Sequence, residues 1–524
     1  MRRRTFLQGM AGMAAGAALR PLWWPALARG GAASTAAAQG KILVMVVFQG
    51  GNDGVNTVIP YTDPLYPVLR PILRVPANEV LTLENGMGFH PSLAPLMPLW
   101  DAGKVGVVQG VGYPDMNLSH FRGTDIILSG SASDEVVNTG WLARWLEAEN
   151  PSFPNELPPD PLALQQGFSA RLPLGGERGT TGVVVNNPET FNAIVGLTYE
   201  GEFSDQVPAT PGGDELAFMR RVDVESFEYA QVIQAAAEGG TNTGAYPNGN
   251  FAGQLGTIAR LIEGGLDTAV FLAARGGFDT HGGQLGAHPV LLDEFAQTVA
   301  AFQEDLDRIG RADDVMILTV SEFGRRVEEN GAQGTDHGTA APWFVIGNGV
   351  QGGLHGAPPP LDSLDDYGNL LVQTDYRSVY ASVLGDWFGA DSDVVNGVLD
   401  GDYSGLSLVS SPAAPNLPAG DGDGDGDGDG GGVGATLPAA MRLHAPMPNP
   451  GSGPRVLRYA LPSGGNVDLS VFDVRGRKVA RVVEGTMPAG THQTTWDPGA
   501  LVSGVYFAVL RAGGQREVQK LVVR

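Results

Sequence analysis

The chain of 524 residues contains no cysteine. This absence excludes disulfide bonds, thiolate metal sites and a cysteine nucleophile. Any metal ion must therefore be held by aspartate, glutamate and histidine side chains, and the chain has only 8 histidines. An oxidising compartment would not harm the protein through its thiols, because it has none.

Positive charge is scarce as well. The chain has 33 lysine and arginine residues against 57 aspartate and glutamate residues, which gives a net charge of −24. A strongly acidic protein repels the phosphates of nucleic acids and of anionic membrane surfaces. The composition therefore predicts that the protein has no nucleic-acid partner.

The N-terminal segment 1–28 lacks an apolar run long enough to anchor it in a membrane. Its basic start, a short apolar stretch from Met10 to Leu19 and small residues up to Ala28 are typical of an export signal. Residues 3–8 (RRTFLQ) resemble the twin-arginine signal, which directs folded proteins to export. The predicted mature form, cut after Ala28 or after Ala38, has no transmembrane segment.

Between residues 40 and 411 the sequence alternates between predicted strands and helices. The run from Lys41 to Phe48 is almost entirely apolar, which is typical of a strand buried on both faces of a parallel sheet. Further strands are predicted over 105–108, 268–273, 315–320 and 343–346, and helices over 91–102, 251–262, 289–309 and 376–388. This alternation predicts an α/β domain with a mostly parallel sheet between two layers of helices. Segment 150–213, rich in proline, glycine and asparagine, is predicted to be an insertion that selects the substrate.

The C-terminal part of the chain has a different composition. Residues 412–435 contain a long Asp-Gly repeat, which cannot form an apolar core and is predicted to be a linker rather than a calcium site. Short alternating strands then predict a small all-β sandwich over 437–524, with a turn at Arg475-Gly476. His444 and His492 are predicted to be surface or strand-packing residues, so this domain has no predicted catalytic cluster.

Two glycine-flanked turns each place an aspartate close to a histidine. One contains Asp279 and His281, and the other contains Asp336 and His337. Glycine allows sharp turns that aim neighbouring side chains at one point, and oxygen and nitrogen donors together suit a divalent metal ion. An isolated Asp-His pair is more often a turn with a solvated histidine. Two such pairs indicate one shared site, and we predict one or two ions of Zn, Mn, Fe or Ca.

Further candidate ligands and catalytic residues follow other predicted strands. Asp53 follows the first strand, and Glu322 and Arg325 follow the strand that ends near residue 320. Because the carboxyl ends of parallel strands meet at one edge of a sheet, Asp53, Asp279 and Glu322 are predicted to converge there. His288, at the start of a predicted helix, is a further candidate ligand.

Ser119, His120 and Arg122 lie beyond the strand predicted over 105–108. Ser119 could be a nucleophile supported by the two neighbouring basic side chains. It could equally be the N-cap of a helix that begins at His120. Arg122 or Arg325 could bind the oxygens of an anion in a bidentate manner.

These motifs together resemble the family called domain of unknown function 1501, which is itself similar to the alkaline phosphatase and sulfatase superfamily. The resemblance covers about residues 40–390 and rests on residues 50–54 (GGNDG), 119–121 (SHF), 278–281 (FDTH), 321–325 (SEFGR) and 335–338 (TDHG). It implies an alkaline phosphatase-like fold with one or two divalent metals. The implied metal ligands are Asp53, Asp279, His281, Asp336 and His337, and the implied nucleophile is Ser119.

Two departures from the superfamily pattern concern histidines. The superfamily usually separates an Asp/His pair by three residues, whereas only Thr280 lies between Asp279 and His281. His288 is therefore an alternative partner or a third ligand. A further histidine expected near the end of the domain has only His355 as a candidate, in a poorly matching context.

The C-terminal region resembles the immunoglobulin-like domain of flagellar hook-capping proteins and the sorting domain of type IX secretion substrates. The resemblance rests on residues 448–450 (PNP), 471–477 (VFDVRGR), 496–497 (WD) and 503–506 (SGVY). It implies that export and outer-membrane secretion machinery handle the protein. The expected location is the periplasm, the cell surface or the extracellular space.

The first functional hypothesis is an exported, metal-dependent hydrolase of phosphate or sulfate esters, acting on a small-molecule or glycan substrate. Ser119, His120, Arg122, Glu322 and Arg325 would be its catalytic residues. The alternative is a non-catalytic binding or scaffold protein on the cell surface that retains the superfamily fold. A third hypothesis, that no metal is bound and the turns are only loops, receives less support from the paired Asp and His residues.

Overall fold

The computed structural model describes residues 40–167, 172–198, 210–403, 406–410, 441–443, 455–473, 477–499, 501–502, 504–513 and 515–523. The chain divides into two compact units, Met1–Val394 with Gly405–Ser410, and Val395–Ser404 with Ser411–Arg524. The predicted signal segment 1–28, the linker 412–435 and the turn at Arg475-Gly476 lie outside the described residues. No helix of the described residues is long and apolar enough to cross a membrane.

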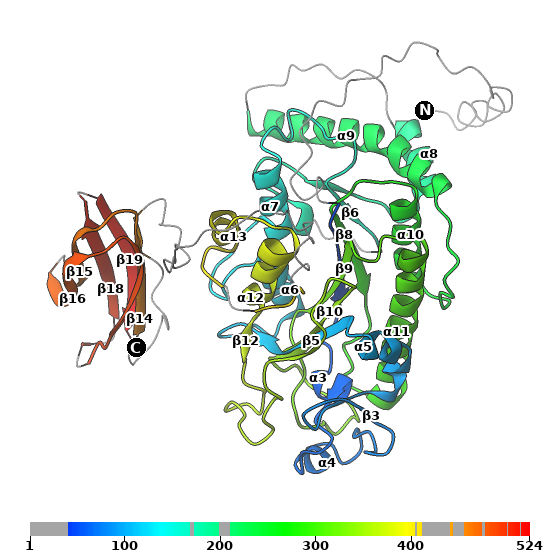
Figure 1. Cartoon of the computed structure of the whole chain (residues 1–524), viewed down its shortest axis with the longest axis horizontal. Helices are drawn as coiled ribbons and strands as arrows, with labels where there is room; N and C mark the ends of the chain where they lie inside the picture. The colour runs from blue at the N-terminus through cyan, green and yellow to red at the C-terminus, as the bar shows by residue number, and fades with distance from the viewer. Residues whose placement is uncertain are drawn as a thin grey trace, which may run out of the picture. The chain divides into compact units, whose positions relative to one another are not determined.

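The first unit is built on a sheet of nine strands (Figure 1). Strand β1 (Ile42–Phe48) is buried along its whole length and pairs in parallel with β8 (Val270–Arg275) and β9 (Val315–Ser321). The strand order is β11-β5-β10-β9-β1-β8-β6-β7, with β12 also paired to β5. The remaining strands are β5 (Val105–Gly112), β6 (Ala163–Gln165), β7 (Gly182–Val184), β10 (Ala341–Ile346), β11 (Gly353–His355) and β12 (Thr374–Asp375).

Strand β10 runs against its neighbours. It pairs antiparallel with β9 on one side and with β5 on the other, while the remaining pairs of this sheet are parallel. The prediction of a mostly parallel sheet is confirmed. The reversed strand brings the residues that precede β10 to the edge where the parallel strands end, and this matters for the site below.

Helices cover both faces of the sheet (Figure 1). Helices α10 (Asn250–Glu263) and α11 (Gln284–Arg308) bury apolar side chains in the same core cluster as β1. On the other face lie α6 (His120–Ser129), α7 (Trp141–Glu149) and α12 (Tyr376–Ser382), where Trp141 stacks on Tyr380 with ring centroids 4.0 Å apart. This layering confirms the predicted α/β class.

Several predicted boundaries are shifted. The helix predicted over 91–102 is a 3-10 helix η1 (Pro91–Leu96) followed by α5 (Met97–Asp101). The helix predicted to begin near Pro289 begins at Gln284, because Pro289 lies inside its early turns rather than at its start. The remaining helices of this part are α3 (Gly54–Thr57), α4 (Tyr66–Leu69), η2 (Leu172–Leu174), α8 (Pro188–Thr198), α9 (Pro211–Gly239) and η3 (Val383–Trp387). Helix α13 (Ser392–Leu399) spans the boundary between the two units.

Segment 150–213 contributes β6 and β7, which pair in parallel and extend the main sheet from β8. The run that forms β7 was predicted as a strand, whereas β6 was not, although both strands are 3 residues long. A separate small sheet joins β2 (Val58–Ile59), β4 (Gly88–Phe89) and β3 (Leu81–Thr82).

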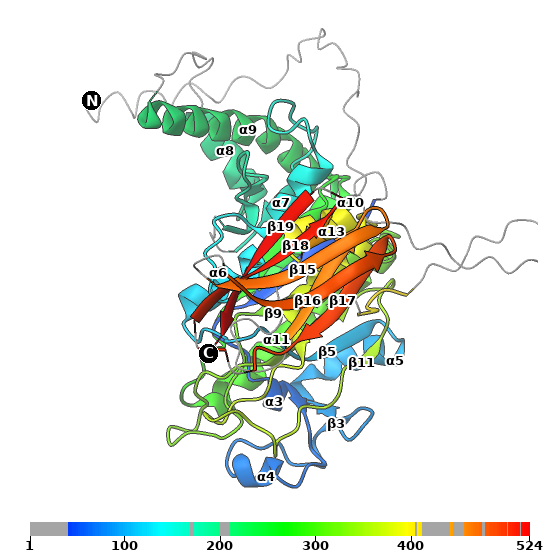
Figure 2. The same cartoon turned by 90° about the vertical axis from the view of Figure 1, so that its left-hand side faces the viewer.

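The second unit contains two antiparallel sheets, in the orders β13-β14-β17 and β16-β15-β18-β19 (Figure 2). Their strands are β13 (Arg442–Leu443), β14 (Arg455–Leu461), β15 (Gly465–Asp473), β16 (Lys478–Met487), β17 (Gly490–Trp496), β18 (Gly504–Ala512) and β19 (Gln515–Val523). Leu457, Leu469 and Leu510 lie in one core cluster formed by both sheets, as a sandwich requires. The predicted all-β sandwich is confirmed. His492 stacks on Tyr459 within it, with ring centroids 5.3 Å apart.

Candidate metal centre

The carboxyl edge of the main sheet gathers the predicted site residues from five segments. The segments after β1, β8 and β9 deliver Asp53, Asp279 and Glu322, and α6 begins at His120 after β5. Because β10 is antiparallel, His337 reaches the same edge from the segment that precedes this strand. Strand direction therefore brings together residues that are far apart in the sequence.

Three side chains at this edge form a group that could hold a metal ion. Ligand atoms of His120, Asp279 and His337 all lie within 4.8 Å of one another. His120 Nε2 lies 3.4 Å from Asp279 Oδ2, and His337 Nε2 lies 3.3 Å from Asp279 Oδ1. This is the one such group of three or more metal-ligating side chains in the described part of the chain.

The second ring nitrogen of each histidine sets the direction of the first. His120 Nδ1–H donates to Glu322 Oε1 at 2.9 Å, and His337 Nδ1–H donates to the Leu118 carbonyl oxygen at 2.8 Å. When the rings are neutral, both Nε2 atoms therefore carry lone pairs that face Asp279. A carboxylate or carbonyl behind the ring is the usual arrangement of metal-binding histidines.

His120 Nε2 is buried and has no hydrogen-bond partner among the described residues. Buried polar atoms without a partner are uncommon, and a lone pair in this position is satisfied by a cation. The donor set of two imidazoles and one carboxylate therefore fits a divalent metal ion.

The Glu322 side chain is 2% exposed and lies behind His120, so it is not among the candidate metal ligands. Its Oε1 also accepts a hydrogen bond from the Gly50 backbone N–H at 2.7 Å. The hydrogen bond to Glu322 raises the pKa of His120, whereas burial lowers the pKa of His337. The two rings therefore differ in basicity although both face the same carboxylate.

Asp279 is held as a carboxylate by Arg325. Burial alone would raise the pKa of Asp279, but the hydrogen bond and the charge of Arg325 lower this pKa to about 2. Arg325 Nη2 lies 2.6 Å from Asp279 Oδ1, and the buried guanidinium also donates to the carbonyl oxygens of Gly50, Gly51, Phe278 and Thr335. These contacts tie the loops of the site together, so Arg325 is not free to bind an anion in this arrangement.

His281 and Asp336 lie on the open side of the group. His281 Nε2 is 2.9 Å from His337 Nε2 and 3.1 Å from Asp279 Oδ1, and its Nδ1 is 3.3 Å from Asp336 Oδ1. Whichever ring nitrogen of His281 carries the hydrogen, a carboxylate oxygen of Asp279 or Asp336 is close enough to accept it. The hydrogen bond from Asn330 is the main cause that lowers the pKa of Asp336, helped by His281 and by the charge of Arg326.

Asp53 has a different partner. It is fully buried and accepts hydrogen bonds from Arg70 Nη1 at 2.7 Å and from Arg70 Nη2 at 3.0 Å, and it also accepts one from Gln284. Burial would raise the pKa of Asp53, but the charge of Arg70 lowers it overall. The structure thus engages Asp53 with a guanidinium, outside the group of His120, Asp279 and His337. Nothing in the local sequence pattern around Arg70 signalled this pair.

The remaining predicted histidines lie apart from the group. His288 is buried on α11, and its Nε2 lies 3.1 Å from Asn52 Oδ1. His355 lies in β11, where its Nε2 donates to the Gln351 carbonyl oxygen at 2.8 Å. The structure does not bring either ring into contact with Asp279.

Ser119 occupies the N-cap position of α6, but its side chain makes no capping hydrogen bond. Its exposed hydroxyl therefore stays available next to His120. Arg122 Nη2 donates to the carbonyl oxygens of Ser133, at 3.3 Å, and of Glu135. Arg122 is thus engaged by the loop after α6 rather than directed at the group.

No curated protein matches this chain. Among solved structures, similarity is found to a protein of the alkaline phosphatase superfamily from Vibrio parahaemolyticus, with 9% identity over 61% of this chain and 63% of that chain and a TM-score of 0.28. The alignment thus spans less than two thirds of the Vibrio chain. A sulfatase from Pseudoalteromonas sp. has 11% identity over 68% of this chain and 72% of that chain, with a TM-score of 0.28. A phosphonate monoester hydrolase from Silicibacter pomeroyi has 9% identity over 92% and 88%, with a TM-score of 0.33.

Two family models match separate parts of the chain and confirm both resemblances inferred from the motifs. The C-terminal match is to the secretion system C-terminal sorting domain, over residues 447–524. It indicates type IX secretion, and the predicted location at the cell surface or outside the cell is confirmed. Residues 214–399 match the family described as protein of unknown function DUF1501.

Proposed function

We propose that this chain is an exported, metal-dependent hydrolase of phosphate or sulfate esters. The observation that carries the proposal is the buried Nε2 of His120, which forms no hydrogen bond within the described residues and faces Asp279 Oδ2 at 3.4 Å, beside the Nε2 of His337. The sequence motifs support the reaction class, because they resemble a superfamily of phosphate and sulfate ester hydrolases.

His120, Asp279 and His337 would hold the metal ion. Three protein donors with a remaining open position are typical of catalytic rather than structural sites. A divalent ion bound there would act as a Lewis acid on the ester oxygen and lower the pKa of a bound water or serine. Two imidazole donors favour zinc, iron or manganese over calcium, which prefers oxygen ligands. We infer one ion rather than two, because Arg70 already neutralises Asp53.

The surrounding side chains would position the ester and move protons. Ser119 offers an exposed hydroxyl directly before a ligand, as a nucleophile requires. His281, with a carboxylate beside each ring nitrogen, can take up or release a proton at the open side. Arg326 is proposed to bind the anion in place of Arg122 and Arg325. Its positive charge acts on Asp336, which lies at the open side of the group.

The first test is metal content and affinity, measured by mass spectrometry and by competition with a chelator on the mature protein. We expect one equivalent of metal in the unmodified protein and none in His120→Ala or His337→Ala. Glu322→Gln should weaken metal binding about 10–100-fold, because the orientation of His120 depends on Glu322. His355→Ala is the matched control and should bind metal normally. Full metal content in the His120 and His337 variants would rule out this site.

The second test is turnover of phosphate and sulfate esters by the metal-loaded protein. Hydrolysis that disappears in Ser119→Ala but not in Ser133→Ala would support Ser119 as the nucleophile. Metal binding without hydrolysis of any ester would favour the alternative, a surface-displayed binding or scaffold protein. One observation favours that alternative: Arg122 and Arg325, the two arginines predicted to bind the anion, are engaged by backbone carbonyls.

A further inference from the structure

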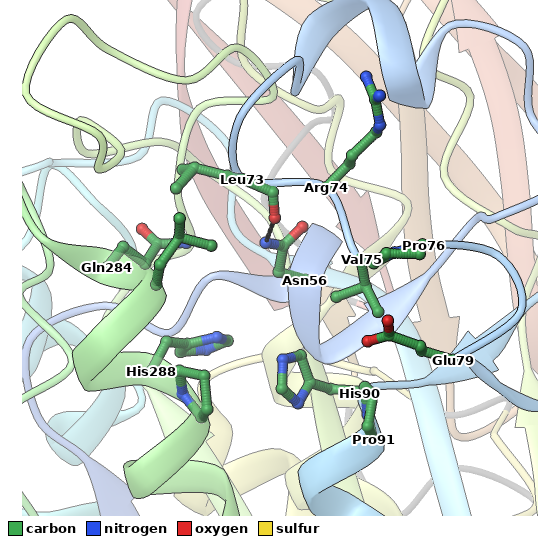
Figure 3. A pocket seen from close by; sticks show the side chains of 12 residues that line it. Asn56, Leu73, Arg74, Val75, Pro76, Glu79, His90, Pro91, Gln284 and His288 are labelled. Carbon is green, nitrogen blue, oxygen red and sulfur yellow. Dashed lines mark hydrogen bonds between the residues drawn. The ribbon is translucent and has the colours of Figure 1, made fainter.

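A second concave site lies away from the metal-binding group (Figure 3). It is a pocket of about 270 Å³ between the start of α11, the start of η1 and the segment that follows α4. Two histidines, His90 and His288, line it from opposite elements, and Figure 3 shows their rings pointing toward one another. The ring centroids are 6.0 Å apart and the planes are nearly perpendicular, at 77°.

His90 presents a hydrogen-bond donor to this pocket. It is 8% exposed, and its Nδ1 accepts a hydrogen bond from the Ser92 backbone N–H at 3.1 Å. Burial lowers the pKa of His90 to about 4, so the ring is neutral at pH 7 and carries its hydrogen on Nε2. No group of the described residues accepts a hydrogen bond from this N–H, so it is available to a ligand in the pocket.

His288 presents the complementary acceptor. It is 2% exposed, and its Nε2–H donates to Asn52 Oδ1 at 3.1 Å. Burial lowers the pKa of His288 to about 4 as well, so the neutral ring keeps a lone pair on Nδ1. No side chain of the described residues donates to this nitrogen.

The rest of the lining combines apolar side chains with Asn56, Gln284 and one charge of each sign, and the amides of Asn56 and Gln284 already form hydrogen bonds with other residues. Leu73, Val75 and Leu285 supply apolar walls, while Arg74 and Glu79 are exposed residues of opposite charge. The volume is below the roughly 300–1,000 Å³ of sites for drug-sized ligands, so the occupant is small. The lining therefore suits a compact ligand without net charge.

We propose that this pocket binds an uncharged, hydroxyl-bearing ligand about the size of one sugar ring. One ligand hydroxyl accepts a hydrogen bond from His90 Nε2–H and donates its own hydrogen to His288 Nδ1. A hydroxyl is the simplest group that both donates and accepts at one atom. The ring carbons of the ligand contact Leu73, Val75 and Leu285.

Other ligand classes fit this lining less well. A metal ion would face the N–H of His90 instead of a lone pair. A phosphate, sulfate or carboxylate would meet two neutral rings and the negative charge of Glu79, with only Arg74 to oppose it. The pocket therefore differs in ligand preference from the group of His120, Asp279 and His337, whose donor set suits a metal ion.

The experiment is ligand-observed saturation-transfer NMR on the mature, full-length protein. The probes are methyl α-glucoside, methyl α-galactoside and myo-inositol, with inorganic phosphate and acetate as charged comparators. We expect at least one uncharged probe to bind, and His90→Asn to weaken its affinity about tenfold through the loss of one hydrogen bond. Asparagine at this position retains an acceptor for the Ser92 N–H. His355→Asn is the matched control and should bind the probe normally.

Leu285→Trp provides a second variant, because this exposed side chain can enlarge without disturbing the core and should fill the pocket. It should abolish probe binding while leaving metal content unchanged, so failure of this proposal is distinct from failure of the metal site. The proposal is overturned if no uncharged probe binds. It is also overturned if His90→Asn, His355→Asn and the unmodified protein bind equally, or if phosphate displaces the probe.

Discussion

Five of the histidines separate into two groups according to the partner of each ring. His120 and His337 each donate through Nδ1 to an oxygen behind the ring, which leaves both Nε2 atoms directed at Asp279. His281 stands beside them on the open side. His90 and His288 are instead buried, and burial lowers the pKa of both rings to about 4, so both are neutral at pH 7. The contacts and the burial of each ring thus separate the two groups.

The buried pair predicts a loss of stability in mild acid. An unfolded histidine has a pKa near 6.5, whereas burial lowers the pKa of His90 and of His288 to about 4. Between these values the unfolded chain binds more protons, so stability is fully present above pH 6.5 and is lost as the pH falls toward 4. Each ring contributes up to about 3 kcal/mol to this loss.

Urea unfolding between pH 7.5 and pH 4.5 measures this effect. His90→Asn should show a flatter decline than the unmodified protein, and His355→Asn should follow the unmodified protein. His90, Arg70, Arg325 and Asp53, whose own pKa is lowered, also act electrostatically on His288. Parallel profiles for His90→Asn and the unmodified protein would contradict the assignment of a neutral, buried His90.

At the scale of elements, two interlocked turns hold the two Asp-His motifs together. Thr335 N–H donates to the Thr280 carbonyl oxygen at 3.1 Å, which joins the turn before β10 to the turn after β8. A β-carbon added to Gly334 would lie 2.3 Å from the carbonyl carbon of His281. Glycine is required at this point because the two backbones touch.

Gly334→Ala should therefore push the turns apart and misplace His337 relative to Asp279. We expect metal affinity to fall at least tenfold and the melting temperature to fall by several degrees. Gly331→Ala in the same loop is the control, because a β-carbon there has no atom within 4 Å. Isothermal titration with zinc and thermal unfolding followed by fluorescence measure both effects. Equal metal affinity in the two variants would show that the turns are not coupled.

At the scale of the whole molecule, the described residues of the two units form separate hydrophobic cores. One is formed by residues between Ile42 and Ile346, and the other by residues between Met441 and Val523. The second coincides with the region that matches the sorting domain. Units with their own cores generally unfold independently.

Calorimetry of the full chain should accordingly show two unfolding transitions. Deletion of residues 411–524 should remove one transition and leave the other at the same temperature, with metal content unchanged. Chelation should lower only the transition that the deleted form retains, because a bound metal stabilises the folded state that holds it. A single transition that shifts as a whole after the deletion would show that the two cores unfold together.

Local patterns in the sequence account for much of this protein. The apolar run of β1, the alternation of strands with helices and the short strands of the C-terminal part specify an α/β domain followed by a sandwich. The glycine-flanked motifs also mark Asp279, His281 and His337 as neighbours in space. These features are readable because each depends on residues close together in the chain.

Only the tertiary structure determines which side chains pair with one another at the site. Glu322 meets His120 across 202 positions of sequence, and the Arg70 guanidinium faces Asp53. The antiparallel direction of β10, which carries His337 to the site, also cannot be predicted from the residues of this strand. An apolar run indicates a buried strand, but it does not indicate in which direction the strand pairs with its neighbours. Long-range pairing and strand direction depend on how the whole sheet assembles, so no local pattern contains them.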